Sequence, residues 1–308
     1  MDAAASPPAR LWAMLVALAS VSRLHIVAIG SSGALTFGWI FTGRYLWLAA
    51  GVCAFDWFVV NLLNRVVDLP EDRLNAIPAT GFVGRHQRII LAAGFGLLGL
   101  SLGLVHIAAP AVTPLRLCGH ALALGYNWPL LPGRRRLKQI YFFKNTASAT
   151  GFLLTVFGYP LVEATGWRWQ HAALCADIMP ATIALAAAFF FLFEVSYEIV
   201  YDLRDAPGDA RAGVRSYPVV HGERGAVRII DSLLAASVAV LLVGYGLGQV
   251  PWRLFIMFAA PLVQFALYKR MLRRGIGAGD CIRLTWVGVG LLATYHVWVL
   301  FDLPGARI

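Results

Sequence analysis

Two short segments of the chain combine carboxylates with the spacing of a cation site. They span residues 64–73 and 202–209 and together hold six of the 16 acidic residues. In a helix, side chains three, four, seven or eight positions apart lie on one face. Each segment therefore predicts a column of oxygen ligands: Asn64, Asp68 and Asp72 in the first, and Asp202, Asp205 and Asp209 in the second.

These columns predict a magnesium site. Carboxylates that lie close together repel one another unless a cation lies among them. Mg²⁺ takes oxygen ligands in octahedral geometry and is usually held by one or two carboxylates together with substrate phosphates. If the two columns face each other, they can hold Mg²⁺ ions that bridge to a diphosphate. We therefore predict all six column residues as metal ligands and the five aspartates as catalytic.

The elements that carry these columns are membrane helices. Of the 308 residues, 59% are hydrophobic and 14% are charged, whereas soluble domains average about 45–50% and about 25%. A spanning helix needs about 20 predominantly apolar residues. The apolar runs predict about nine spans in one all-α domain over residues 1–308, at 24–41, 46–63, 89–109, 113–131, 145–163, 178–200, 229–248, 253–268 and 284–301. Residues 1–10 are expected to be disordered, and the run at 11–22 is too short for another crossing.

The charge distribution indicates the topology of these spans. The formal net charge is +10, but the basic residues alternate by loop and do not form a nucleic-acid face. All but five of the 26 Lys and Arg residues fall near the N-terminus or in the loops after even-numbered spans. The positive-inside rule then places the N-terminus and both motif loops in the cytoplasm and the C-terminus on the opposite side. The five exceptions are Arg44, Arg116, Arg168, Arg253 and Arg307.

At its acidic segments the chain resembles the UbiA superfamily of intramembrane prenyltransferases. The family's first motif reads Asn-Asp-x-x-Asp-x-x-x-Asp. It is matched by Asn64, Asp68 and Asp72, with Arg65 in place of the Asp that usually follows the Asn. The second motif, Asp-x-x-Asp-x-x-x-Asp, is intact over residues 202–209. The substitution at Arg65 leaves the metal arrangement of the first motif open.

The resemblance implies a helical bundle around a central cavity that opens sideways to lipid and is capped by the motif loops. It implies transfer of a prenyl group from an isoprenoid diphosphate to an aromatic or lipid-like acceptor. Mg²⁺ would neutralise the charge that develops on the leaving diphosphate. We expect the diphosphate to be bound by Asn64, Arg23, Arg73, Lys138, Lys144, Arg204 and Tyr141. The basic run at Arg134, Arg135 and Arg136 is assigned to the lipid surface.

Two carboxylates inside the sixth span are candidates for orienting or deprotonating the acceptor. Glu194 and Glu198 precede Asp202 by about two turns and one turn on the same face. Ionisable side chains inside a span are costly and usually face a functional interior. Either carboxylate can orient the acceptor or take its proton, and we predict Glu198 as catalytic. The other predicted residues of the cavity wall are Asn127, Tyr126, Asn145 and Tyr197.

Two alternatives to prenyl transfer stay open at this level. A terpene cyclase on the same scaffold ionises the same diphosphate but captures the cation internally. A cation-coupled transporter would use the acidic residues to bind the transported ion. Transport sites usually lie near the bilayer midplane, whereas the acidic segments lie at span ends, which favours an enzyme.

Overall fold

The computed structural model describes residues 21–74, 77, 79–168 and 173–305, and this part of the chain is helical without a strand. The expected disorder of residues 1–10 and nearly all of the short apolar run at 11–22 lie outside the described residues. The predicted all-α class is confirmed.

Six rods in the described part are long and apolar enough to cross a membrane. They correspond to the first, second, third, sixth, seventh and eighth predicted spans. The structure therefore establishes an integral membrane bundle but does not confirm the count of nine. The six rods are α2 (Leu24–Thr42), α3 (Trp47–Val67), α5 (Thr80–Ala108), α9 (Pro180–Arg211), α10 (Tyr217–Gly246) and Trp252–Leu272, which joins α11 (Trp252–Phe255), η5 (Ile256–Phe258) and α12 (Ala259–Leu272).

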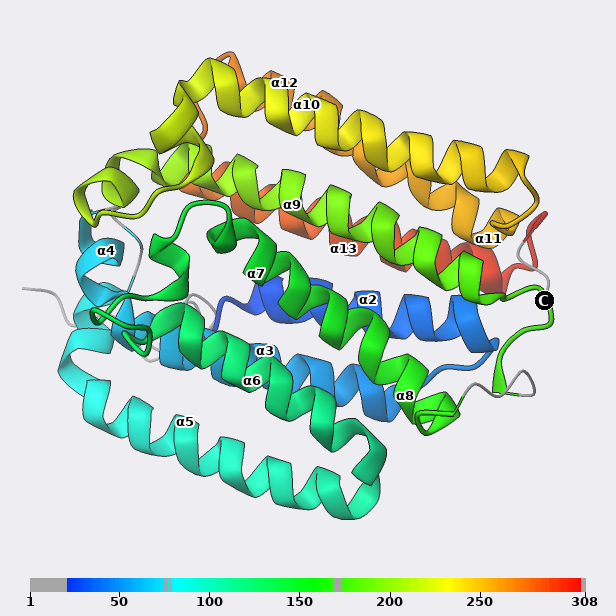
Figure 1. Cartoon of the computed structure of the whole chain (residues 1–308), viewed down its shortest axis with the longest axis horizontal. Helices are drawn as coiled ribbons and strands as arrows, with labels where there is room; N and C mark the ends of the chain where they lie inside the picture. The colour runs from blue at the N-terminus through cyan, green and yellow to red at the C-terminus, as the bar shows by residue number, and fades with distance from the viewer. Residues whose placement is uncertain (1–20, 75–76, 78, 169–172, 306–308) are drawn as a thin grey trace, which may run out of the picture.

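The remaining predicted spans are helices that run beside the six rods (Figure 1). The fourth is short, and the fifth is made of three consecutive pieces. Two further short elements, η1 and η2, flank the fourth span. These elements are η1 (Pro110–Val112), α6 (Thr113–Asn127), η2 (Leu137–Gln139), α7 (Phe143–Leu153), the π-helical η3 (Leu154–Gly158), α8 (Tyr159–Thr165) and α13 (Ala278–Leu300).

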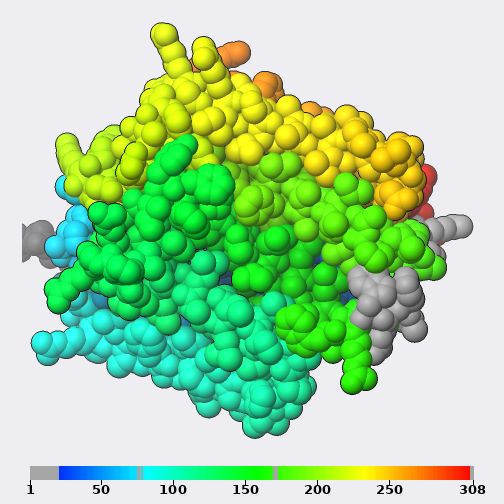
Figure 2. Space-filling view, in the orientation of Figure 1, coloured from blue at the N-terminus to red at the C-terminus, as the bar shows by residue number. Residues whose placement is uncertain are grey.

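The helices lie roughly parallel and antiparallel in one bundle (Figure 1). α2 packs on α3 and α13, α7 packs on α9, and α10 packs on both α9 and α12. On the face shown in Figure 2, side chains of α5, α6, α7, α9 and α10 close over most of the gaps between the ribbons. The short α4 (Leu69–Leu74) and the end of α9 lie at the same end of the bundle, which we call the motif end.

The outer face of α5 is built for contact with lipid. Ile89, Leu100, Leu104 and Ile107 are each more than half exposed. Hydrocarbon offers no hydrogen bonds, so a spanning segment satisfies its backbone within the helix and turns apolar side chains outward. The exposed apolar stripe of α5 is therefore a membrane-facing surface.

The two acidic segments fold differently at the motif end. α3 ends at Val67, Asp68 caps it, and α4 starts at Leu69. α9, in contrast, continues through Pro207 to Arg211. The first segment therefore crosses a break between two helices, whereas the second lies on one continuous helix.

A packed aromatic wall lies in the middle of the bundle. Trp57 stacks on Phe152 with ring centroids 4.0 Å apart, and its indole N–H donates to Thr155 Oγ1 at 3.0 Å. Thr155 belongs to η3, and such π-helical insertions are frequent at functional sites. Gly30 lets α2 approach this indole, because a Cβ at that position would lie 3.0 Å from Trp57 Cδ1.

Candidate active site

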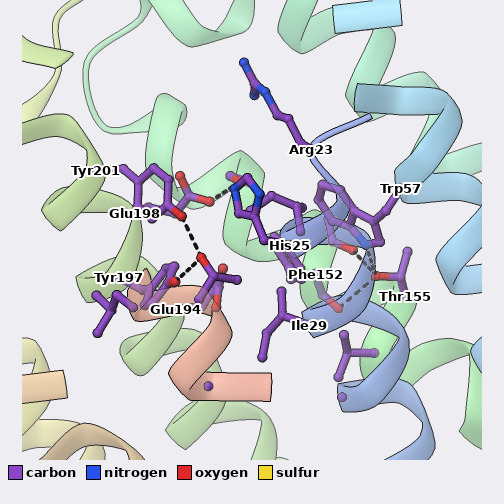
Figure 3. A pocket seen from close by; sticks show the side chains of 18 of the residues that line it. Arg23, His25, Ile29, Trp57, Phe152, Thr155, Glu194, Tyr197, Glu198 and Tyr201 are labelled. Atoms are coloured by element: carbon purple, nitrogen blue, oxygen red, sulfur yellow. Dashed lines mark hydrogen bonds between the residues drawn. The ribbon is translucent and has the colours of Figure 1, made fainter. Parts of the chain in front are cut away.

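A large cavity of about 840 Å³ is lined by most of the residues predicted for chemistry. It is lined by side chains from α2, α3, α4, α6, α7, α9, α12 and α13, and both acidic segments contribute to its wall. Figure 3 shows side chains of α9, among them Glu194 and Glu198, across the cavity from Trp57 and Thr155, with His25 of α2 between them. The predicted central cavity is thus present.

The first segment forms an acidic pair around one lysine. Lys138 Nζ lies 2.5 Å from Asp68 Oδ1 and 2.6 Å from Glu71 Oε2. Arg136 also reaches this pair, with Nη1 at 3.2 Å from Asp68 and 2.9 Å from Glu71. The assignment of Arg136 to the lipid surface is wrong, because the loop turns this side chain inward beside η2. Glu71 was missed as a site residue because the predicted column took only the residues four positions apart, Asn64, Asp68 and Asp72.

Asp72 does not join this pair but forms an ion pair with Arg65. Arg65 is fully buried, and a second guanidinium, that of Arg23, lies 3.7 Å from Asp72. Burial raises the pKa of Asp72 above its ordinary value of 3.8, although both guanidinium groups lower it. The column predicted from Asn64 to Asp72 is therefore divided, with Asp72 held by the arginine that replaces a motif aspartate.

The second segment brings two of its three aspartates together. Lys144 Nζ lies 2.7 Å from Asp202 Oδ1 and 2.6 Å from Asp209 Oδ2. Asn145 Nδ2 donates to Asp202 Oδ2 at 2.8 Å, so Asn145 stands behind the aspartate and not on the cavity wall. Asp205 accepts two hydrogen bonds from its neighbour Arg204, at 2.7 and 2.5 Å.

The oxygen atoms of these residues are suitable ligands for a divalent ion. Among the described residues no three acidic or imidazole groups come close enough to hold a metal by themselves. Mg²⁺ needs only one or two carboxylates when phosphates and water supply the other ligands. Asp202 and Asp209 already converge on one ammonium nitrogen. In addition, Asn64 Oδ1 is a buried oxygen on the cavity wall that has no hydrogen-bond partner among the residues the structure describes.

The carboxylates of α9 line the cavity below the acidic pairs. Glu198 Oε1 accepts a hydrogen bond from Ser148 Oγ at 2.7 Å, whereas no described residue donates one to Glu194. Tyr197 shares Thr285 with Tyr201 through hydroxyl contacts of 2.5 and 2.6 Å. The arrangement offers one positioned carboxylate and one that is open to a ligand.

The remaining predicted residues divide between the cavity and the surface. Tyr126 and Asn127 line the cavity, and Asn127 Oδ1 is buried without a partner. Arg73 is exposed and does not line the cavity. Tyr141 also lies outside the cavity wall, where its hydroxyl contacts His221 Nε2 at 2.6 Å. The geometry does not bring these last two to the diphosphate site.

Residues 11–287 match the family model described as the UbiA prenyltransferase family. The chain belongs to the UbiA prenyltransferase family. It is therefore an enzyme, a prenyltransferase, and the transporter alternative is set aside. Solved UbiA structures share the fold: a homologue from Archaeoglobus fulgidus bound to GPP and Mg²⁺ superposes with a TM-score of 0.68 at 16% identity, over 91% of this chain and 98% of that one.

Two curated relatives of this UbiA family member are named for different reactions. The chain is 29% identical to a 4-hydroxybenzoate octaprenyltransferase from Pseudoalteromonas atlantica, over 77% of this chain and 70% of the relative. It is 30% identical to a digeranylgeranylglyceryl phosphate synthase from Pyrococcus abyssi, over 70% of this chain and 68% of the relative. Family membership thus establishes the class of enzyme, and the acceptor has to be inferred from the residues of the site.

Proposed function

We propose that this UbiA prenyltransferase binds an isoprenoid diphosphate at the motif end of its cavity and transfers the prenyl group to an acceptor held deeper in the bundle. The observation that carries the proposal is the pair of acidic clusters across one cavity, each built around a lysine. UbiA homologues from Archaeoglobus fulgidus bind GPP or DMAPP together with Mg²⁺, which supports this donor class.

Mg²⁺ is proposed to be held by Asp68 with Asn64 on one side and by Asp202 with Asp209 on the other. When bound, it would stabilise negative charge on the departing diphosphate. Lys138, Lys144 and the guanidinium groups of Arg23 and Arg204 would bind the phosphate oxygens, because an ammonium that now bridges two carboxylates can turn to an incoming anion.

Residues of the chain would then act on the prenyl group and on the acceptor. The C1–O bond of the donor breaks, and diphosphate leaves with the electron pair. The acceptor forms the new bond to C1 and loses a proton, for which Glu198 is the proposed base, one turn below Asp202. Tyr197 and Tyr201 present aromatic groups on the same wall, and their π faces would stabilise the cation.

The basic motif end is proposed to face the cytoplasm, on the strength of the charge distribution. An anionic donor made in the cytoplasm then reaches the acidic clusters directly, and its apolar tail enters the bilayer-embedded part of the cavity. The whole chain is proposed to act as one domain, since both acidic segments close the same cavity.

The decisive experiment is release of diphosphate from geranyl diphosphate by the purified enzyme in lipid nanodiscs. We expect release with Mg²⁺, its loss in EDTA, and its loss in Asp202→Asn and Asp68→Asn. Asp231→Asn is the matched control, because Asp231 pairs with Lys269 and does not line the cavity. Release that persists in EDTA or in both motif variants would overturn the proposal. Product analysis with membrane extract as an acceptor source separates transfer from cyclisation.

A further inference from the structure

A third polar cluster lies deeper in the bundle, away from both acidic pairs. It joins Asp56 of α3, Arg116 and His120 of α6, and Tyr159 of α8. The exposed fractions are 2% for Asp56, 1% for Arg116, 7% for His120 and 1% for Tyr159. Three of these residues, Asp56, His120 and Tyr159, line the same cavity as the acidic pairs. Ionisable side chains at such depth indicate a functional interior.

Asp56 and Arg116 satisfy each other. Arg116 donates to the two carboxylate oxygens at 3.0 and 2.5 Å, and Tyr159 donates its hydroxyl to Asp56 Oδ2 at 2.7 Å. Arg116 also donates to the carbonyl and hydroxyl oxygens of Ser101 on α5 at 2.9 Å. This ion pair and its hydrogen bonds therefore link α3, α5, α6 and α8. His120 is the member of the cluster that can still form hydrogen bonds with a ligand.

His120 is buried with both ring nitrogens short of partners. Nε2 lies 3.2 Å from Asp56 Oδ1 but lacks an aligned hydrogen bond, and Nδ1 has no hydrogen-bond partner in the described part of the chain. Leaving a buried donor or acceptor unpaired destabilises the fold, and a ligand that pairs with it relieves this cost. Because the ring also lines the cavity, a ligand is the natural partner for it.

The position of His120 places that ligand away from the motif end of the cavity. Asp56 lies eight residues before Asn64 on α3, which corresponds to about 12 Å of helix rise. His120 lies seven residues before Asn127 on α6, or about 10 Å. A group bound by His120 therefore lies deeper in the cavity than Asn64 and Asn127, and Trp57, which follows Asp56 on α3 and stacks on Phe152, lines the same cavity.

We propose that His120, oriented by Asp56, binds the hydroxyl group of an aromatic acceptor. In the tautomer with hydrogen on Nε2, a small rotation of the ring would align this N–H with Asp56 Oδ1, 3.2 Å away, and Nδ1 would accept a hydrogen bond from the acceptor hydroxyl. The inference rests on the proposed function, since it assigns the acceptor of the same reaction to a hydroxylated aromatic compound. It adds a binding residue that the acidic motifs do not indicate.

The test measures binding directly, without turnover. Fluorine NMR compares para-fluorophenol with para-fluorotoluene in nanodiscs that contain the enzyme, corrected for nanodiscs without it. We expect the phenol to bind about tenfold more tightly than the toluene, as one buried hydrogen bond allows. His120→Leu should remove this preference, and His120→Gln, which keeps an acceptor oxygen, should retain part of it.

His296→Leu is the matched control. His296 is also a histidine of the bundle, but its nitrogens contact Thr36 Oγ1 and the Tyr45 hydroxyl, and it does not line the cavity. This variant should keep the preference for phenol. Equal binding of the two probes by the wild type, or an unchanged preference in His120→Leu, would overturn the inference. Release of diphosphate from geranyl diphosphate tests the proposed function separately, because water can form the new bond to C1 and lose the proton when no acceptor is bound.

Discussion

At the residue scale, Lys144 occupies the point where the second acidic segment converges. Its ammonium lies within 2.7 Å of Asp202 and Asp209, and this contact offsets the repulsion between the two carboxylates. A divalent ion that binds there has to compete with the lysine. In the proposed reaction, a bound diphosphate would remove this competition, since it would offer the ammonium another anion and the metal further oxygens.

The competition predicts a change in metal binding when Lys144 is replaced by Met. Mn²⁺, counted by electron paramagnetic resonance, should bind Lys144→Met about tenfold more tightly than wild type when no diphosphate is present, because two uncompensated carboxylates remain. Lys269→Met, which removes an ammonium paired with Asp231 outside the cavity, should leave Mn²⁺ binding unchanged. Equal affinities of wild type and Lys144→Met would show that Asp202 and Asp209 do not hold the metal.

Arg65 is a second residue whose role follows from its burial. Its guanidinium is fully buried and paired with Asp72. Replacing it with Met leaves a buried carboxylate with only the distant Arg23, and breaking such a pair costs about 3–5 kcal/mol. We expect Arg65→Met to lower the free energy of unfolding in mixed micelles by an amount of this order, and the double variant with Asp72→Asn to recover part of the loss. A double variant that is no more stable than Arg65→Met would argue against the pair.

At the element scale, hydropathy located the spans, but side-chain packing determined where they end. The third predicted span began at residue 89, whereas α5 begins at Thr80. Hydropathy missed the first turns of α5 because they carry polar residues. The second acidic segment kept helical spacing through Pro207, so Asp202 and Asp209 meet as a helix predicts. The first did not, since α3 ends at Val67.

The residues of the deep Asp56 cluster were missed from the sequence for a different reason than Glu71. Asp56 and Arg116 are 60 positions apart, and Asp56 and Tyr159 are 103 positions apart. Nothing in the spacing of isolated residues predicts such a cluster, because only the packing of α3, α6 and α8 brings them together. Sequence motifs located the acidic segments at the helix ends. They could not locate a polar cluster whose residues come together only when the helices pack.

A loop contact at the end opposite the motifs predicts a pH-dependent contribution to stability. Arg253 donates to Asp177 at 2.6 and 2.5 Å and to the Ile40 carbonyl at 3.0 Å. The hydrogen bonds from Arg253 lower the pKa of Asp177 below its ordinary value of 3.8. A depressed carboxyl pKa stabilises the fold above the ordinary value, and this contribution is lost as the pH falls through the depressed value.

Asp177→Asn should therefore unfold at a lower temperature than wild type at pH 7, and the gap should close below about pH 4. The side chain of Asp177 is half exposed, so solvent screening limits the loss to about 0.5–1 kcal/mol. Thermal unfolding in detergent at several pH values measures it. A gap that stays constant down to pH 3 would mean that the charge of Asp177 is not involved.

At the scale of the whole molecule, one helix joins the polar and apolar parts of the cavity. Cavity-lining residues of α9 run from Phe189 to Asp209, which is about 30 Å of helix and matches the hydrocarbon thickness of a bilayer. The proposed diphosphate chemistry lies at the motif end, and the far part of the α9 wall is apolar, with Phe189, Phe190 and Phe193 lining the cavity. An isoprenoid tail therefore has a path along α9 whose length is limited by aromatic side chains.

This geometry predicts that Phe189 limits the length of the donor. Phe189 lies 13 residues before Asp202, or about 20 Å along α9, and is 2% exposed. Phe189→Ala should raise the rate with geranylgeranyl diphosphate relative to geranyl diphosphate by about tenfold, the scale of one apolar contact in a pocket. Phe191→Ala is the matched control, because Phe191 packs in a different cluster and does not line the cavity.

The two donors, compared in one preparation, separate specificity from damage to the fold. Removing a buried phenylalanine costs about 3–5 kcal/mol of stability, which would lower the rates with both donors together. Only enlargement of the apolar end raises the rate for the long tail while the short donor, which does not reach Phe189, keeps its own. If the ratio of the two rates is the same in Phe189→Ala, Phe191→Ala and wild type, the tail does not run along α9, and the path has to be sought between α2 and α13, whose residues line the other side of the cavity.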